Sequence, residues 1–507
     1  MTITRGRVWK LFVPLNLALL GYVLFFAGLR AARPGTVFYY TEGPVLGSLA
    51  ALEATGELSS LYPADGWTEP PVVLTLYPPL YFVAAAEVDR RLGSEGTFLG
   101  LRIVSLLAFA GVLGLLAYHA VRRRASGAWL LAVGGAALMT PALFRLAGGA
   151  QADMLALFLT WVGLTAAVDH EDGSVRRGPL PLTLAAAAFL FAFLSKQSFV
   201  AAPAALVLTL ALRGRVQAAL AFALPLAAAA LAAVFLLDGL TGGGYLANTL
   251  GALTGDASFA NLRATLAESE PLQWLPVVVA VLLAVRGHMR FGLPEIYLLG
   301  SAALHTTAMV KTGSSVNYLL EPTFALLFLA VLRGSPDASA NRGASAPRWM
   351  GISWNPALIV ALALALPAVA AVWRSAPNVR ALAGAAGTAQ VAEFAGHPLV
   401  APLFFPAVLA RGGRPWLNDP FAFGAMEETG KWNPARLVED LEERRIPFAL
   451  STVDPAYGQA PPGEGSRELV LGYFWMSPPV WQALNGAYTA SVSGPLTAWL
   501  PREDESQ

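Results

Sequence analysis

The sequence contains no cysteine and few charged residues. Of its 507 residues, only 13% are Asp, Glu, Lys or Arg. The absence of thiols excludes disulfides, thiolate catalysis and Cys-ligated zinc or iron–sulfur centres. The formal net charge is +1, and no tract of Lys or Arg interleaved with aromatic residues occurs. We therefore expect no binding of nucleic acid.

Short motifs of several enzyme classes are also missing. The chain has no phosphate-cradling Gly-rich loop and no Ser nucleophile elbow. Its five histidines are scattered, with no pair at zinc-ligand spacing. Nucleotide-sugar and ATP chemistry lose support for this reason. The sequence therefore predicts no required cofactor, and it leaves open whether a divalent metal takes part.

Apolar residues, in contrast, are abundant. Hydrophobic residues make up 56% of the chain, and its mean hydropathy is +0.55. A helix needs roughly 20 apolar residues to cross a bilayer. On this criterion the sequence predicts about eleven membrane spans, at residues 11–30, 99–121, 128–146, 152–168, 180–194, 198–212, 216–237, 272–285, 293–310, 317–332 and 356–373. The segment 74–93, which has two prolines and a charged end, predicts a helix lying on the membrane interface.

Basic residues indicate the orientation of these spans. Clusters of Arg and Lys fall in alternate gaps, beginning before residue 11. The positive-inside rule then places the N-terminus in the cytoplasm. It places the long loop 31–98 and the tail from residue 374 on the extracytoplasmic side. The membrane is expected to be the inner membrane of a bacterium. The first apolar run also resembles a signal peptide, which is a second interpretation of that segment.

The last 130 or so residues have shorter apolar runs, more charges and regular turn signals. Asn433 and Pro434 predict the start of a helix. Strands are predicted at 446–453, 466–475 and 487–500. The predicted fold class is therefore mainly α: a polytopic membrane helix bundle over residues 1–373, followed by a small extracytoplasmic soluble α/β domain over residues 374–507.

Polar residues next to apolar helices are the candidates for function, because each costs on the order of 2.5 kcal/mol or more at the centre of a bilayer. The candidates are Glu42, Asp153, Lys196, Lys311, and Glu321 with Asn317 and Tyr318 one helical turn away. Taken singly, each has a simpler interpretation as a loop acid, a helix cap or a snorkelling lysine. The predicted topology places them all at the outer face, where Lys311, Lys196 and Arg102 are candidate partners of Glu321.

This one-sided distribution favours an enzyme over a transporter. Transporters usually bind their substrates near the bilayer midplane, where this chain has almost no ionisable groups. Carboxylates beside lysines suit transfer from a phosphate-activated lipid to an acceptor hydroxyl. A lipid or glycan transporter or flippase, and a non-catalytic membrane assembly protein, are the alternatives.

Several strings resemble one family. They are Tyr77-Pro78-Pro79-Leu80-Tyr81, Leu101-Arg102-Ile103-Val104-Ser105, Gln151-Ala152-Asp153, Ser195-Lys196-Gln197, Asn317-Tyr318-Leu319-Leu320-Glu321-Pro322 and the tail string 411–420. Together with the acid Glu42 after the first span, they are similar to the GT-C superfamily of polytopic glycosyltransferases. Within it, the chain resembles bacterial proteins similar to protein O-mannosyltransferases and the lipid A aminoarabinose transferase.

The resemblance implies inverting transfer of a sugar from a polyprenyl-phosphate donor to a glycan, lipid or protein acceptor at the extracytoplasmic face. It assigns the role of general base to Glu42. Lys196 is the first choice for the donor phosphate, with Arg102 and Lys311 as weaker choices, and Asp153 shapes the site. Many relatives carry Asp, or an Asp-Glu pair, where this chain has Thr41-Glu42, so metal dependence is left open.

Overall fold

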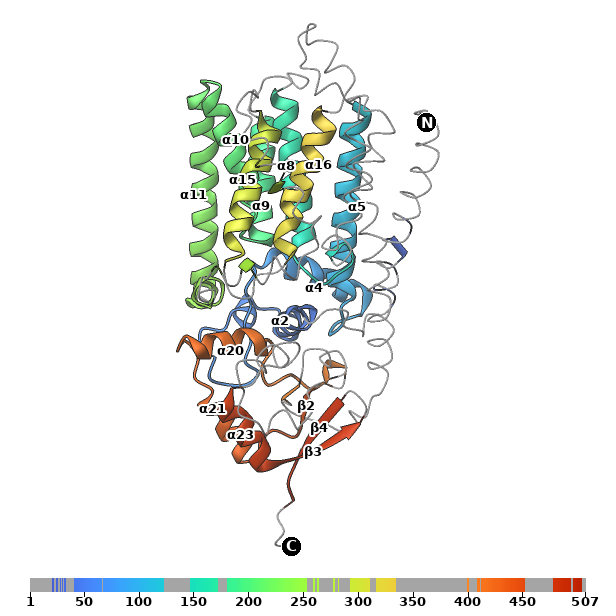
Figure 1. Ribbon diagram of the computed structural model, residues 1–507, viewed down its shortest axis with the longest axis vertical. Coiled ribbons are helices and arrows are strands. Elements are labelled where there is room, and N and C mark those ends of the chain that lie inside the picture. Colours follow the sequence, from blue (N-terminus) through green and yellow to red (C-terminus); the bar gives the residue numbers. More distant parts are fainter. Residues whose placement is uncertain are drawn as a thin grey trace.

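A computed structural model gives the architecture of the chain. It describes residues 41–65, 67–122, 146–171, 180–252, 292–310, 316–333, 399–400, 408–410, 412–451, 477–493 and 496–503, with isolated positions between 21 and 32 and between 259 and 281. Long apolar segments form a bundle of roughly parallel and antiparallel helices, and a smaller α/β part lies beyond one end of this bundle (Figure 1).

The bundle is built from the apolar runs that the sequence offers. Its helices are α5 (Leu99–Arg122), α8 (Asp153–Glu171), α9 (Leu180–Ser195), α10 (Ala201–Leu212), α11 (Val216–Leu240), α15 (Leu293–Ala308) and α16 (Leu320–Arg333). They coincide with seven of the predicted spans. Predicted spans 11–30, 128–146, 272–285 and 356–373 lie wholly or mostly outside the described residues.

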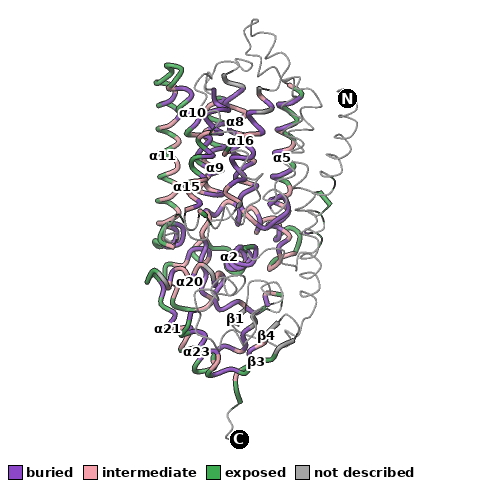
Figure 2. Tube along the Cα trace, in the orientation of Figure 1, coloured by how far each residue is buried: buried purple, intermediate pink, exposed green. Residues whose placement is uncertain are grey.

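Two of the described helices, α5 and α11, are long and apolar enough to cross a membrane, and four shorter apolar helices accompany them. Their surroundings differ. Half of the most apolar window of α5 is buried in the protein, against 6% for α11. A helix that is apolar all round yet buries so little of its surface needs a nonpolar solvent. The outer surface of α11 is therefore suited to lipid (Figure 2).

Short helices between residues 41 and 98 cover one end of the bundle. They are α2 (Glu42–Thr55), α3 (Leu58–Leu61) and α4 (Leu80–Leu92), and Figure 1 shows α2 and α4 between the bundle and the α/β part. α4 packs closely on α5 because residue 100 is glycine. A Cβ at Gly100 would lie only 2.4 Å from the carbonyl oxygen of Ala85 and from Asp89.

Two carboxyl groups meet at this corner of the loop. Glu53 accepts a hydrogen bond from the Gly96 N–H at 2.8 Å, and Asp89 accepts one from the Gly100 N–H at 2.8 Å. The two side chains also contact each other. Burial raises the pKa of Glu53 to about 8, and the nearby charges of Asp89 and Glu95 add to this rise. Burial likewise raises the pKa of Asp89, so one proton is retained by the pair.

This pair predicts a pH dependence of stability. The ordinary pKa of Glu53 is 4.5 and its folded value is about 8, so the folded state prefers the protonated acid. Its contribution is complete below pH 4.5 and is lost as the pH rises towards 8. We expect Glu53→Gln to remove ~1–2 kcal/mol of this loss, a figure reduced for partial solvent exposure. Thermal unfolding at pH 5 and pH 8.5 measures how much stability each protein loses between these pH values. An equal loss in variant and wild type would contradict a proton shared by Glu53 and Asp89.

The C-terminal part combines helices with a small sheet. It contains α20 (Pro420–Glu428), α21 (Ala435–Glu442) and α23 (Pro478–Ala487), with strands β1 (Leu399–Val400), β2 (Ala449–Ser451), β3 (Tyr488–Ser493) and β4 (Leu496–Pro501). The strand order is β1-β2-β4-β3, where β1 pairs with β2 in parallel and the other pairs are antiparallel. Trp416, Trp481 and Trp499 are buried among these elements.

The predictions for this part meet mixed outcomes. As predicted, a helix starts next to Asn433, whose Oδ1 accepts from the Ala435 N–H at 2.9 Å. The predicted strand 446–453 is present but shorter, as β2. The prediction of one strand over 487–500 was wrong, because this segment forms the hairpin β3–β4, as its Gly494-Pro495 pair would allow. The predicted strand 466–475 lies outside the described residues.

Candidate functional site

Buried polar side chains gather at the end of the bundle that α2 and α4 cover. Helices α8 and α16 begin at this end, and α9 and α15 finish there (Figure 1). Because helix termini carry the polar backbone groups that apolar helix centres lack, this end is where charged side chains find partners. Among the described residues, three pairs of ionisable groups lie there.

The first pair joins Glu42 to Arg102, and both side chains are completely buried. Glu42 is the first residue of α2, and Arg102 lies in the first turn of α5. Arg102 Nη2 donates to Glu42 Oε2 at 2.9 Å, and the N–H of Ala150 donates to Oε1 at 3.0 Å. Both carboxylate oxygens are therefore occupied. A second guanidinium nitrogen of Arg102 donates to the carbonyl of Arg30 at 3.0 Å.

The second pair joins Asp153, the first residue of α8, to Lys196, which follows the end of α9. Lys196 Nζ lies 2.6 Å from Asp153 Oδ1, and the Lys196 side chain is only 8% exposed. Two aromatic rings enclose the ammonium group, Tyr77 at 5.2 Å and Tyr318 at 5.8 Å. Cation–π attraction thus supplements the ion pair. Burial raises the pKa of Tyr77 to about 12, so this phenol remains a neutral donor.

Tyr81 of α4 links the first two pairs. Its hydroxyl lies 2.9 Å from Ser105 Oγ and donates to the carbonyl of Leu101 at 2.8 Å. Ser105 in turn donates to the carbonyl of Gln151 at 3.2 Å. The Gln151 amide donates to the hydroxyl of Thr41. The residues just before Asp153 are thereby tied to α4, α5 and the start of α2.

The third pair joins Glu321 to His305 across α15 and α16. The two side chains are buried, with His305 Nε2 at 2.5 Å from Glu321 Oε2. The His305 and Tyr318 rings are tilted to each other, with 5.8 Å between their centroids. The ring of Tyr318 also contacts the ammonium group of Lys196. The third pair is therefore continuous with the second.

The partners expected for Glu321 need correction. Lys196 pairs with Asp153, and Arg102 pairs with Glu42. Neither cation is the partner of Glu321, because each is paired with another carboxylate and Glu321 is paired with His305. Lys311, the third candidate partner, lies outside the described residues. Among the candidates, the structure brings together Glu42, Arg102, Asp153, Lys196, Tyr318 and Glu321.

Sequence reasoning missed several members of this cluster. His305 was passed over, although a histidine within an apolar helix facing an acidic helix start is a detectable signal. Tyr77 and Tyr81 belong to the string 77–81, and nothing in their spacing indicates that Tyr77 faces a lysine. Within the described ranges, no group of three His, Asp or Glu side chains gathers closely enough to hold a metal ion.

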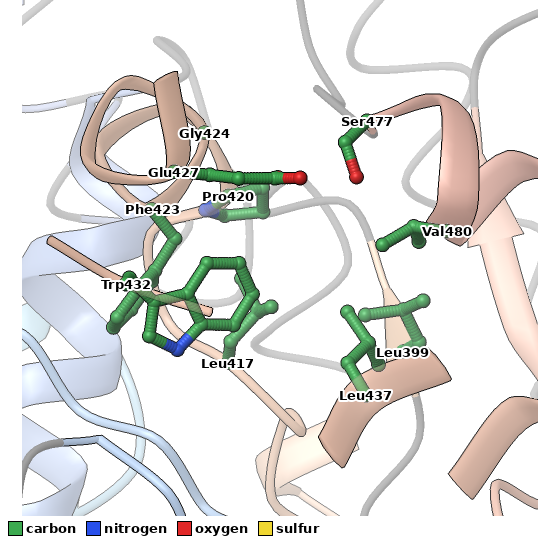
Figure 3. A pocket seen from close by; sticks show the side chains of 10 residues that line it. All are labelled: Leu399, Leu417, Pro420, Phe423, Gly424, Glu427, Trp432, Leu437, Ser477 and Val480. Atoms are coloured by element: carbon green, nitrogen blue, oxygen red, sulfur yellow. The ribbon is translucent and has the colours of Figure 1, made fainter. Parts of the chain in front are cut away.

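A small cavity lies elsewhere, in the C-terminal part (Figure 3). It holds about 20 Å³ of space, which is room for roughly one water molecule. Apart from the hydroxyl of Ser477 and the carboxylate of Glu427, its lining is mostly apolar, with the ring of Trp432 on one side. Its size and its distance from the three ion pairs make it a poor candidate for chemistry.

Comparison with solved structures finds the same architecture in ArnT from Cupriavidus metallidurans. The structure bound to undecaprenyl phosphate matches with a TM-score of 0.54 and 16% identity, covering 98% of both chains. The apo structure matches with a TM-score of 0.51 at the same identity and coverage. No protein-family model and no curated protein sequence matches the chain. The resemblance drawn from the motifs is thus confirmed at the level of the fold: this chain has the fold of ArnT.

Proposed function

We propose that this chain is an integral-membrane glycosyltransferase of the GT-C type, which moves a sugar from a polyprenyl-phosphate donor to an acceptor hydroxyl. The observation that carries the proposal is the buried cluster of ion pairs at one end of a bundle with the ArnT fold. The solved ArnT structure holds undecaprenyl phosphate, which supports the same class of donor here. The acceptor is a glycan, a lipid or a protein.

Lys196 is suited to the donor phosphate. Its ammonium group needs an anion as partner, and Asp153 provides one in the structure described. A phosphate that enters beside it shares the cation, and its negative charge grows as the glycosidic bond breaks. A buried cation stabilises that developing charge more strongly than an exposed one. Arg102, Lys311, Tyr318 and Glu321 are proposed to complete this phosphate and substrate region.

Glu42 is proposed as the general base. In an inverting transfer the acceptor oxygen attacks the anomeric carbon opposite the phosphate, the bond from carbon to phosphate oxygen breaks, and the base takes the acceptor proton. Both oxygens of Glu42 already accept hydrogen bonds. The bond from the Ala150 N–H to Oε1 must therefore break before this oxygen can accept the acceptor proton. The neighbouring Thr41 is exposed and Gln151 partly so, and we propose that the acceptor enters on this side.

The membrane arrangement follows from the same proposal. Residues 1–373 would form the transferase body and residues 374–507 an extracytoplasmic domain, with the N-terminus in the cytoplasm of a bacterium. Alternating clusters of Arg support this orientation. The polar cluster would then face outside, where polyprenyl-phosphate sugars present their head groups.

Transfer and transport can be separated in proteoliposomes. We expect the purified chain, supplied with a panel of polyprenyl-phosphate sugars and candidate acceptors, to form a glycosylated product and free polyprenyl phosphate. Downhill movement of the donor across the bilayer without any product would favour a flippase instead. Addition of a chelator in a parallel reaction tests whether a divalent metal takes part.

A further inference from the structure

Asn418 joins the C-terminal part to the outer loop. It is buried, with 2% exposure, and pairs with both backbone groups of Leu74: its Oδ1 accepts from the N–H at 2.8 Å and its Nδ2 donates to the carbonyl at 3.1 Å. The adjacent backbone continues this contact. The Val72 N–H donates to Trp416 at 2.7 Å, and the Asn418 N–H donates to Val72 at 3.1 Å, as a parallel bridge between Val72 and Leu417.

The same amide also contacts α2. Asn418 Nδ2 lies 3.0 Å from Ser48 Oγ and 3.3 Å from the carbonyl of Pro44. Pro44 is two residues after Glu42 in the first turn of the helix. One side chain of the C-terminal part therefore holds both the start of α2 and the segment that follows Val72.

Two further amides hold the next residues of this segment. Asn248, at the end of the bundle, accepts from the Thr75 N–H at 3.1 Å and donates to the carbonyls of Pro63 and Gly244. Gln197, next to Lys196, donates to the carbonyl of Leu76 at 2.8 Å. Three consecutive residues, 74 to 76, are thus each bound by an amide from a different part of the chain.

The segment ends at Tyr77, whose ring covers Lys196 at 5.2 Å. We infer that Asn418 is a positioning residue: through Leu74 it fixes the segment 72–77, and so places Tyr77 over the lysine proposed to bind the donor phosphate. This inference rests on the proposed function for its catalytic meaning, but the placement itself is a separate physical claim. The C-terminal part thereby acts on the site without touching the substrate.

The placement can be tested without any activity, because the chain has only four lysines. Labelling with a water-soluble reagent that reacts with amines, followed by peptide mass spectrometry, gives the labelling rate of Lys196 relative to that of the exposed Lys431. We expect Asn418→Ala to raise the relative rate for Lys196 by about tenfold, since two buried hydrogen bonds to Leu74 are lost. The matched control is Asn485→Ala, because the Asn485 amide only donates to the carbonyl of Trp481 within α23. In this control Lys196 should be labelled at the wild-type rate. An unchanged rate in a folded Asn418→Ala variant would overturn the inference.

A disulfide provides the rescue. The chain has no cysteine, and Val72 faces Leu417 in the bridge, so a Val72→Cys/Leu417→Cys pair can close this contact without competing thiols. In the Asn418→Ala background, oxidation should return Lys196 labelling towards the wild-type rate, and reduction should raise it again. If Asn418→Ala does not fold, the same pair in the otherwise native chain should lower labelling on oxidation, and an equal rate in both redox states would contradict the inference.

Kinetics then connect the placement to catalysis. For Asn418→Ala we expect the KM for the donor to rise about tenfold with kcat changed less than about threefold, and the oxidised cysteine pair to restore KM. A loss confined to kcat, or a KM that oxidation does not restore, would contradict a positioning role. If the wild-type chain itself transfers no sugar while the labelling results hold, the proposed function fails and the placement stands.

Discussion

Replacing Glu42 by Gln is expected to lower kcat for sugar transfer by at least ~100-fold, because a positioned general base contributes about 10² to 10⁴. The substitution keeps the shape of the side chain and removes its charge. Arg102 would then lose the carboxylate that pairs with it in a fully buried position, and breaking a buried ion pair in this way costs about 3–5 kcal/mol of stability. Steady-state transfer and thermal unfolding measure the two effects separately.

A double variant distinguishes the base role from a structural one. Glu42→Gln with Arg102→Met replaces the ion pair by neutral groups of similar size, so it should recover much of the stability. It should not recover transfer, because no base is restored. Full activity in Glu42→Gln, or activity that returns with stability in the double variant, would show that Glu42 only holds α2 against α5.

Replacing Lys196 by Met is expected to reduce kcat/KM for the donor by about 10² to 10³, the usual effect of removing one preorganised group that stabilises developing charge. Lys196→Arg keeps the charge and should lose less, although its larger planar head fits poorly between the rings of Tyr77 and Tyr318. Donor titrations with the purified variants measure these changes.

Asp153 supplies the matched control for Lys196. Lys196→Met leaves the carboxylate of Asp153 buried without its cation, and this alone destabilises the fold. Adding Asp153→Asn should restore stability but leave transfer impaired. Recovery of transfer in this double variant would mean that Lys196 serves Asp153 and not the donor phosphate.

The helices of the bundle were largely predictable from the sequence. The run that became α5 was expected at 99–121 and ends at Arg122, and α9 was expected at 180–194 and ends at Ser195. Bilayer thickness explains this success, because it imposes a length and a composition that local sequence reveals. The hairpin β3–β4 was misread as one strand, since strand signals are shorter and depend on turn chemistry.

The pairing of charges was not predictable in the same way. Glu42 and Arg102 were both identified, as were Asp153 and Lys196, but which acid meets which base depends on how the helices pack. Of the three expected partners of Glu321, Lys196 and Arg102 pair with other acids and Lys311 lies outside the described residues, whereas His305 meets Glu321. Sequence position indicated which end of the bundle is polar, whereas helix packing selected the partners.

The amides that hold residues 74–76 were the hardest to anticipate. Asn418 lies in the tail string 411–420, and Asn248 lies in a glycine-rich segment after α11. Neither has a periodic pattern around it, and each contacts backbone more than 170 positions away. Side chains that bind distant backbone leave no local signature, because the backbone they bind is the same for every sequence.

Release of polyprenyl phosphate tests the central claim most directly. Purified chain in proteoliposomes, given a radiolabelled polyprenyl-phosphate sugar and its acceptor, should release one polyprenyl phosphate for each sugar transferred. The release should fall at least ~100-fold in Glu42→Gln and comparably in Lys196→Met, with Asn485→Ala at the wild-type rate. Donor that stays intact in wild type across the sugar panel, or variants that release it at the wild-type rate, would contradict the assignment of this buried cluster as a glycosyltransferase site.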